Sequence, residues 1–182
     1  MISTAQLSVR EMSESDIPLI ADYWLFSDPE YLTNMGVDLV KVPSRNALIS
    51  MLTEQLTQEY HEKKSYCIIW ELENEPIGHS NVNSIVYGEA AAMHLHIWKV
   101  DVRRKGFGSS YLRMTLPYFF NNLKIENLYC EPYSLNPSPN KTLERLGFKF
   151  IKSYTTIPGS LNFEQTVNRW EMSRWQFEKL YP

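Results

Sequence analysis

The chain has 182 residues, 43% of them hydrophobic and 21% charged, and this composition is typical of a folded globular protein. We expect a single domain over residues 1–182, and the net charge of −3 argues against broad electrostatic binding to nucleic acid, which needs a basic surface. No run approaches the roughly 20 apolar residues that span a bilayer, and the N-terminal segment lacks the apolar core of a signal peptide, so we expect a cytoplasmic protein with no membrane partner.

The first third of the chain contains signals for one strand and two helices. Residues 7–12 alternate in polarity and predict a strand. Residues 13–24 begin with cap-forming side chains and carry Pro18 in the first turn, which predicts a helix. Residues 26–38 are rich in turn-forming residues. A longer helix is predicted over residues 44–60 by the helical spacing of its apolar side chains, namely Leu48, Met51, Leu52 and Leu56.

The middle of the chain predicts an antiparallel meander. Residues 65–72 are rich in aromatic and β-branched side chains, and the polar turn ENEP joins them to residues 77–88. A third run, residues 91–100, follows after a short break at Gly88 and Glu89. Three consecutive strands joined by short turns are therefore expected.

The last part of the chain alternates helices with strands. Residues 109–123 have one apolar helical face, and Pro117 within them predicts a kink or an early end. A strand is predicted over residues 125–133. Residues 138–148 then predict a short helix that has Ser138 as its N-cap and Gly147 at its C-terminal turn. Two final strands are predicted, over residues 148–156 and 164–173. The order indicates a mixed α/β domain with a mostly antiparallel sheet.

The two cysteines, Cys67 and Cys130, both lie within apolar runs. In a reducing compartment, cysteines in such surroundings are free buried thiols rather than a disulfide. Neither has sequence neighbours that would mark it as a nucleophile.

The stretch KVDVRRKGFGSS, residues 99–110, combines positive charge with two glycines between a predicted strand and a predicted helix. This arrangement predicts an anion site, because freed backbone N–H groups and the helix dipole attract the anion and glycines let it approach the main chain. The stretch is not a P-loop, which needs G-x-x-x-x-G-K-[ST], nor the dinucleotide motif G-x-G-x-x-G, which would need glycine where Tyr111 stands. The pattern that fits is R-x-x-G-x-G, filled by Arg103, Gly106 and Gly108.

With this pattern the sequence resembles the acyl-CoA-dependent N-acetyltransferases of the GNAT superfamily, in which the segment wraps the pyrophosphate of coenzyme A. A second element strengthens the resemblance: Asn136 is followed eleven residues later by Gly147, the glycine of an L-G-F triplet. The S-x-x-D opening of the first helix and the strand VNRWEMS resemble the branch that includes the ribosomal-protein N-terminal acetyltransferases. The resemblance implies an α/β (α+β) fold of GNAT type, with a mixed, mostly antiparallel central sheet of about six to seven strands flanked by about four helices.

The resemblance also implies the coenzyme contacts. Backbone N–H groups of the glycine stretch are expected on the pyrophosphate, side chains of Arg104 and Lys105 on the phosphates, and the end of the preceding strand on the pantetheine arm. The residues expected to bind acetyl-CoA are Trp98, Val100, Val102, Arg103, Arg104, Lys105, Gly106, Phe107, Gly108, Ser109, Asn136 and Asn140. A turn whose glycines merely supply positive φ is the structural alternative for this stretch.

The candidate catalytic residues are His96, Asn136, Ser138 and Glu131. A histidine suits the base, because its pKa near 6.5 allows it to take a proton from an amine through water. His94 and His96 alternate on one face of a strand, and they could instead share a metal ion or be structural. No third ligand at helpful spacing supports the metal, so none is expected.

The acid is unassigned. Many family members carry a tyrosine four residues before the L-G-F glycine, but Leu143 stands there. Ser138 or a water is the substitute, and Asn136 is expected to contact the pantetheine or order a water near the thioester. Tyr133 lies nearby and could equally be a packing residue.

The leading hypothesis is an N-acetyltransferase that moves an acetyl group from acetyl-CoA to a primary amine by direct attack on the thioester. The acceptor is expected to be a protein N-terminus or a small-molecule amine, and the protein a monomer or homodimer. Two alternatives stay open: an acyl-CoA-binding module without catalysis, which Leu143 supports, and an unrelated phosphate-loop protein, which ATP or NAD binding would reveal.

Overall fold

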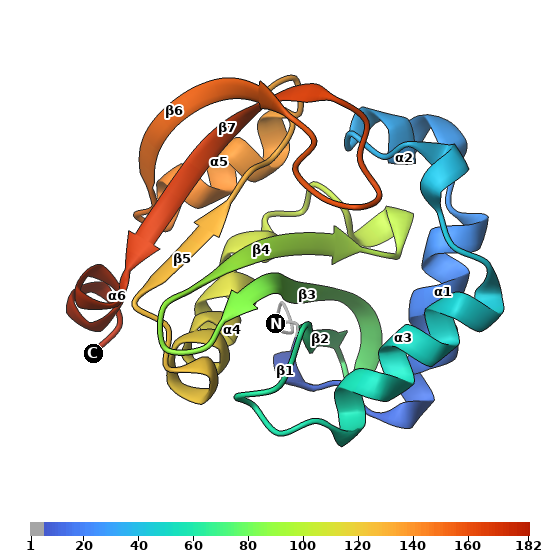
Figure 1. Cartoon of the computed structure of the whole chain (residues 1–182), viewed down its shortest axis with the longest axis horizontal. Helices are drawn as coiled ribbons and strands as arrows, with labels where there is room; N and C mark the ends of the chain where they lie inside the picture. Colours follow the sequence, from blue (N-terminus) through green and yellow to red (C-terminus); the bar gives the residue numbers. More distant parts are fainter. Residues whose placement is uncertain (1–5) are drawn as a thin grey trace, which may run out of the picture.

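The computed structural model describes residues 6–182 and contains one seven-stranded sheet in the order β1-β2-β3-β4-β5-β7-β6 (Figure 1). Every neighbouring pair is antiparallel except β4 and β5, which are parallel. The mixed, mostly antiparallel sheet expected from the sequence is therefore confirmed. The strands are β1 (Leu7–Glu11), β2 (Tyr66–Leu72), β3 (Glu75–Val86), β4 (Ala90–Ile97), β5 (Asn127–Cys130), β6 (Lys149–Thr156) and β7 (Gln165–Ser173).

Within residues 6–182, six α-helices accompany the sheet, rather than the four or so expected. The two that sequence patterns missed are short: α2 begins at an Asp28 cap and Pro29, which look like a turn, and α6 follows β7 directly through a capping box of Ser173 and Gln176. The helices are α1 (Ile17–Phe26), α2 (Pro29–Asn34), α3 (Arg45–Thr57), α4 (Phe107–Leu123), α5 (Pro137–Arg145) and α6 (Arg174–Leu180), with 3₁₀ turns at Glu14–Asp16, Leu39–Lys41 and Val100–Val102. No helix within residues 6–182 is long and apolar enough to cross a membrane.

Two local expectations were wrong. Helix α4 does not end at Pro117 but continues to Leu123, because Leu116, Phe119 and Phe120 are fully buried in the core, and this packing outweighs the roughly 3 kcal/mol that an interior proline costs. The N-cap position of α5 is Asn136 rather than Ser138, since Pro137 takes the first helical position and supplies its fixed φ there.

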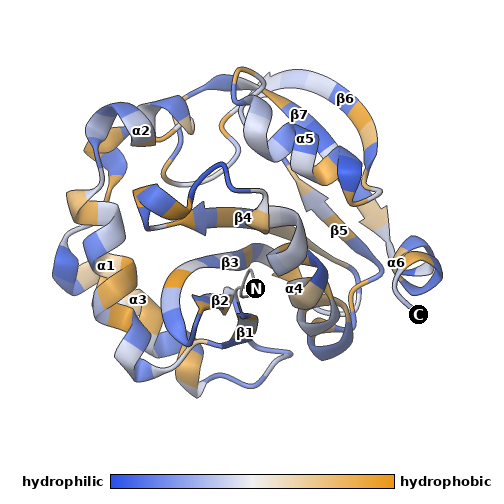
Figure 2. Cartoon of the chain, turned by 180° about the vertical axis from the view of Figure 1, so that it is seen from behind, coloured by the Kyte–Doolittle hydropathy of each residue, from blue (hydrophilic) through white to orange (hydrophobic). Residues whose placement is uncertain are grey.

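The helices lie on both faces of the sheet. Helix α4 packs against β1, β2 and β3 over a large core that includes Ile68, Trp70 and Tyr111. In the view of Figure 2, α4 lies on the side of the sheet that faces the reader. The hydropathy colouring of the same figure shows mixed hydrophobic and hydrophilic segments on α1 and α3. These two helices pack on the other face over a smaller cluster, which contains Ile20, Cys67 and Ile69.

The strands β4 and β5 part halfway along. Only Ala90, Ala91 and Ala92 pair with β5, while β4 continues to Ile97 paired with β3 alone. Within residues 6–182, no strand pairs with the other edge of residues 93–97. Backbone N–H and C=O groups on that edge therefore face an opening in the sheet.

The opening is bridged on its outer side by two segments far apart in the sequence. The loop between β6 and β7, residues 157–164, lies beside the segment that follows α2 (Figure 1). The Asp38 N–H donates to the Leu161 carbonyl at 2.8 Å, and the Lys41 ammonium donates to the Asn162 carbonyl at 2.7 Å. These contacts enclose the space in front of β4.

Candidate active site

A cavity of about 510 Å³ lies in front of the diverging strands. Its walls come from β3 and β4, from the segment after β5, from α1 and α3, and from the β6–β7 loop. Pockets that bind small molecules have volumes of this order. We refer to this space as the cavity.

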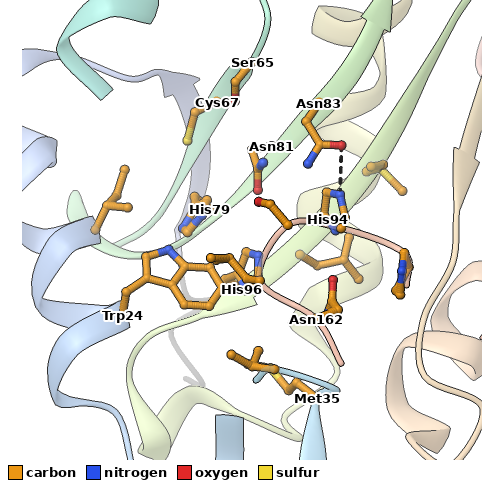
Figure 3. A pocket seen from close by; sticks show the side chains of 18 of the residues that line it. Trp24, Met35, Ser65, Cys67, His79, Asn81, Asn83, His94, His96 and Asn162 are labelled. Atoms are coloured by element: carbon orange, nitrogen blue, oxygen red, sulfur yellow. Dashed lines mark hydrogen bonds between the residues drawn. The ribbon is translucent and has the colours of Figure 1, made fainter. Parts of the chain in front are cut away.

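A row of polar side chains on β3 and β4 faces the cavity. His79, Asn81 and Asn83 alternate along β3, and His94 and His96 alternate along β4, so all five share one face of the sheet. The register pairs His79 with His96 and Asn81 with His94. Figure 3 shows this row, with Oδ1 of Asn83 3.2 Å from Nε2 of His94.

His96, a predicted catalytic residue, lines the cavity close to α1. Its Nδ1 lies 3.2 Å from the hydroxyl of Tyr23, its ring contacts Trp24 edge to face, and it stacks on His79 with ring centroids 4.7 Å apart. Burial above all, and then the neighbouring histidines, hold the pKa of His96 well below its usual value. His96 is therefore a neutral imidazole at neutral pH, with an unprotonated nitrogen available.

His79 was not singled out from the sequence. It is 3% exposed, and its Nδ1 accepts a hydrogen bond of 2.8 Å from the indole N–H of Trp98. Burial, followed by the nearby His94, lowers the pKa of His79 to about 3. Its ring is therefore neutral and carries its proton on Nε2. The alternation HSNVN in β3 is the signal that would have found it, because every second residue there is polar.

His94 lines the cavity one register step from His96. Burial lowers its pKa to about 4, and the negative charge of Glu131 opposes that shift. Its Nε2 is already engaged with Asn83. The arrangement makes His94 less free than His96 to exchange a proton.

Glu131, a predicted candidate for the base, lies at the end of β5 with an 11% exposed side chain. One of its oxygens forms an ion pair of 2.9 Å with Arg169 and accepts a hydrogen bond from the hydroxyl of Tyr154. The carboxylate is thus held by β6 and β7. This environment favours a structural ion pair over a base, since protonation would break the pair.

Asn136 and Ser138 fall on different sides of the start of α5. Asn136 lines the cavity, and its side chain makes no capping hydrogen bond, so it is available to a ligand. Ser138 is exposed and is not among the residues that line the cavity. The position of Ser138 gives no support to its predicted role as the acid.

Asn140 was expected to bind the coenzyme, but its side chain is fully used within the protein. Its amide nitrogen donates to the carbonyls of Tyr133 and Asn136, at 3.3 and 2.8 Å. Its Oδ1 accepts from Asn168 and from the indole of Trp170, both at 2.9 Å. An amide that makes these four bonds has no donor or acceptor left for a ligand.

The start of α4 has the features of an anion site. No side chain in the described part of the chain caps this helix, and the N–H groups of its first residues lack partners within the helix. Gly106 has a φ of +83°, and a Cβ on Gly106 or Gly108 would meet no protein atom within 4 Å. The hydroxyl of Ser109 is buried without a hydrogen-bond partner in residues 6–182. Open space, free donors and an unpartnered hydroxyl together fit a phosphate group.

The segment between β4 and α4 differs from expectation. Strand β4 ends at Ile97, and the N–H groups of Trp98 and Val102 donate to the Ile77 and Lys99 carbonyls, at 2.8 and 3.2 Å. Val102 is buried in the core. Val100 is 74% exposed. The N–H groups of Trp98 and Val102 are thus unavailable for hydrogen bonds to a pantetheine arm, and the free backbone lies earlier, at residues 93–97.

Arg103 also has an internal role. Its guanidinium donates to the carbonyls of Ile97 and Trp98, at 2.9 and 3.1 Å, and lies over the ring of Tyr31 at 3.5 Å. Its own N–H donates to the Val100 carbonyl at 3.2 Å. The next two residues, Arg104 and Lys105, are exposed. Their side chains, unlike that of Arg103, are therefore free to contact phosphate.

Three further residues, Cys67, Cys130 and Leu143, have simple structural explanations. Both cysteines are free and buried, and burial raises the pKa of each thiol, that of Cys130 to about 12. Leu143, in place of the frequent tyrosine, is fully buried in the large core, so it does not face the cavity. Within residues 6–182, no three His, Cys, Asp or Glu side chains lie close enough together to hold a metal ion.

One comparison with known proteins identifies a family. A model described as "Acetyltransferase (GNAT) domain" matches residues 6–149. A search of curated proteins by sequence finds no match.

Solved structures share the fold at low identity. The spermidine N-acetyltransferase from Vibrio cholerae in complex with CoA and spermine has a TM-score of 0.77 at 18% identity, over 95% of this chain and 98% of that one. The RimL ribosomal L7/L12 alpha-N-protein acetyltransferase in complex with coenzyme A has a TM-score of 0.74 at 17% identity, over 95% and 96%. The aminoglycoside acetyltransferase AAC(6')-Ib in complex with coenzyme A has 0.73 at 17%, over 96% and 98%. These likenesses confirm the expected fold.

Proposed function

Because the chain belongs to the GNAT acetyltransferase family, we propose that it transfers an acetyl group from acetyl-CoA to a primary amine, either a protein N-terminus or a small-molecule amine. The amine nitrogen attacks the thioester carbonyl carbon and the carbon–sulfur bond breaks. The amine gives up one proton, and coenzyme A leaves as its thiol. The chain therefore has to hold a phosphate-bearing donor, polarise a carbonyl oxygen and accept a proton.

The observation that carries the proposal is the arrangement of groups at the start of α4. Here the first N–H groups of the helix, the open space at Gly108 and the unpartnered hydroxyl of Ser109 come together. The exposed side chains of Arg104 and Lys105 add positive charge beside them. These groups suit the pyrophosphate of the donor, because a helix start favours negative charge.

The free edge of β4 supplies the next requirement. Among the described residues 6–182, no strand pairs with residues 93–97 on the β5 side, so backbone N–H groups there can donate to the acyl carbonyl and to the amide carbonyls of the donor's arm. Residues 93–96 of this edge also border the cavity. The carbonyl is thus proposed to lie where the donor and acceptor spaces meet.

His96 is the proposed proton acceptor. It faces the cavity as a neutral imidazole, and Tyr23 fixes its orientation through Nδ1. An amine becomes strongly acidic once it has attacked a carbonyl, so a weak base can remove its proton at that stage. For the acid we propose Tyr133 in place of the exposed Ser138, because Tyr133 lines the cavity just after β5 and carries a hydroxyl.

The burial of Leu143 favours a second candidate function. Leu143 is buried where many family members have a tyrosine hydroxyl that can act as an acid, which favours a module that binds acyl-CoA without catalysis.

The cytoplasm is the proposed compartment, because both cysteines are free thiols and a reducing environment keeps them so.

Two measurements distinguish the acetyltransferase from the acyl-CoA-binding module. Isothermal titration with acetyl-CoA and CoA measures binding, and a thiol-release assay across primary amines and peptides measures turnover. Binding with turnover supports the acetyltransferase. Binding without turnover on any amine supports the binding module, and absence of CoA binding would overturn both.

A further inference from the structure

The cavity offers little charge to an acceptor. Among residues 6–182, the carboxylates that line it are Glu54 and Glu131, and Lys64 is the lining lysine. Glu54 and Lys64 are exposed at the rim, and Glu131 is already paired with Arg169. The three histidine rings that line it, His79, His94 and His96, are neutral because burial holds the pKa of each below its usual value. An ammonium group other than the reacting amine would therefore lose its water here without gaining a free counter-charge.

Amide side chains take the place of charges. They come from three separated regions of the chain, namely α3, β3, and the loops around α5 and β7. They are Gln55, Gln58, Asn81, Asn83, Asn136, Asn162 and Gln165. Figure 3 shows Asn81 and Asn83 on one wall, and Asn162 approaching from the β6–β7 loop. Each amide can donate and accept, which is what the N–H and C=O groups of a peptide require.

Gln165 is the lining amide whose side-chain oxygen has no hydrogen-bond donor within residues 6–182. It is 4% exposed, and its Nε2 donates to the carbonyls of Gly36 and Phe163, at 2.8 and 3.1 Å. These two bonds fix the orientation of the amide, so its Oε1 is the atom left over. Oε1 is buried and has no hydrogen-bond partner within residues 6–182. A buried acceptor without a donor costs free energy, and because Gln165 lines the cavity, an N–H group of a ligand that reaches Oε1 would remove that cost.

We propose that the cavity accepts an amine carried on an uncharged body with amide groups, such as a peptide whose first residues are neutral, and discriminates against polycationic amines. The inference rests on the proposed acetyltransferase function and specifies its substrate class. Apolar side chains, including Trp24 and Met35, leave room in the same cavity for an uncharged side chain of that acceptor. The polycation meets only the rim residue Glu54 as a free acid.

The test compares three acceptors with acetyl-CoA as donor: seryl-alanyl-alanine amide, seryl-lysyl-lysine amide and spermidine. The expected kcat/KM for the neutral peptide exceeds the other two by about tenfold or more. Turnover that favours spermidine or the lysyl peptide would overturn the inference while leaving the acetyltransferase function intact. Loss of turnover on every acceptor would instead count against the proposed function and, with it, the inference.

A carboxylate placed in the cavity provides a second readout. Asn81→Asp is expected to raise the ratio of kcat/KM for the lysyl peptide over the neutral peptide by about tenfold. Asn127→Asp is the matched control, because Asn127 is exposed on β5 away from the cavity, and its ratio is expected to stay unchanged. An unchanged ratio in Asn81→Asp would overturn the placement of the acceptor, and Asn83→Asp repeats the test if the first variant does not fold.

Discussion

The side-chain amide of Gln165 occupies the space that a Cβ on Gly36 would need. A carbon built there would lie 2.2 Å from Oε1 and 2.5 Å from Nε2. Gly36 has a φ of +89°, and its carbonyl accepts the hydrogen bond of 2.8 Å from Nε2. Glycine at this position thus joins the segment after α2 to the start of β7.

Gly36→Ala is therefore expected to destabilise the protein by about 2 kcal/mol or more, through backbone strain and displacement of the amide. Urea unfolding measures the change. Gly88→Ala is the matched control, because Gly88 has a φ of +79° but no atom within 4 Å of its Cβ position, so it isolates the strain. Equal losses in the two variants would show that the contact with Gln165 contributes nothing.

Gly108→Asp is expected to weaken binding of CoA by about a hundredfold, because it places a carboxylate where the phosphates are proposed to lie. The fold should tolerate the change, since no protein atom lies near and an acidic residue suits a helix start. Isothermal titration measures the affinity. Ser110→Asp carries the same charge at an exposed position of the same helix, and similar losses in both variants would point to a general charge effect.

His96→Asn is expected to lower kcat by about a hundredfold and to leave the affinity for acetyl-CoA unchanged, since the amide can keep the contact with Tyr23 but cannot take a proton. His94→Asn, one register step away, should lose less activity. Steady-state kinetics and titration separate the two effects. A larger loss of kcat in the His94 variant would assign the base to that residue.

Stability is expected to fall as the pH drops below about 6.5. The pKa of His79 is lowered to about 3 and that of His94 to about 4, so between these values and 6.5 the unfolded state binds more protons than the folded state. As the pH falls through this range, each histidine lowers the free energy of unfolding by up to about 1.4 kcal/mol per pH unit. Above pH 6.5 both states hold a neutral histidine, so this loss is absent. Urea unfolding between pH 4 and 7 measures the slope, which should be shallower in His79→Asn. An unchanged slope in that variant would contradict the neutral state of His79.

Much of the fold follows from local signals. The hairpin of β2 and β3 has alternating strands around a polar turn, and the R-x-x-G-x-G pattern lies where β4 gives way to α4. The histidines His94 and His96 alternate as strand residues on one face do. Such features depend on neighbours in the sequence, and sequence patterns report those well.

The features that were missed depend on contacts between distant parts of the chain. Gln165 and Gly36 are 129 residues apart, and nothing near either of them predicts the contact. The place of His79 beside His96 depends on strand register, and the engagement of Asn140 depends on Asn168 and Trp170 in β7. The divergence of β4 from β5 is likewise a property of the assembled sheet.

That divergence leaves the sheet one strand short over residues 93–97. A ligand whose amides lie along this edge would take the place of a neighbouring strand. Its hydrogen bonds would extend the pairing that β5 makes with β4 only at residues 90–92. Binding would then contribute directly to folding, and the melting temperature should rise with the concentration of any molecule that fills the gap.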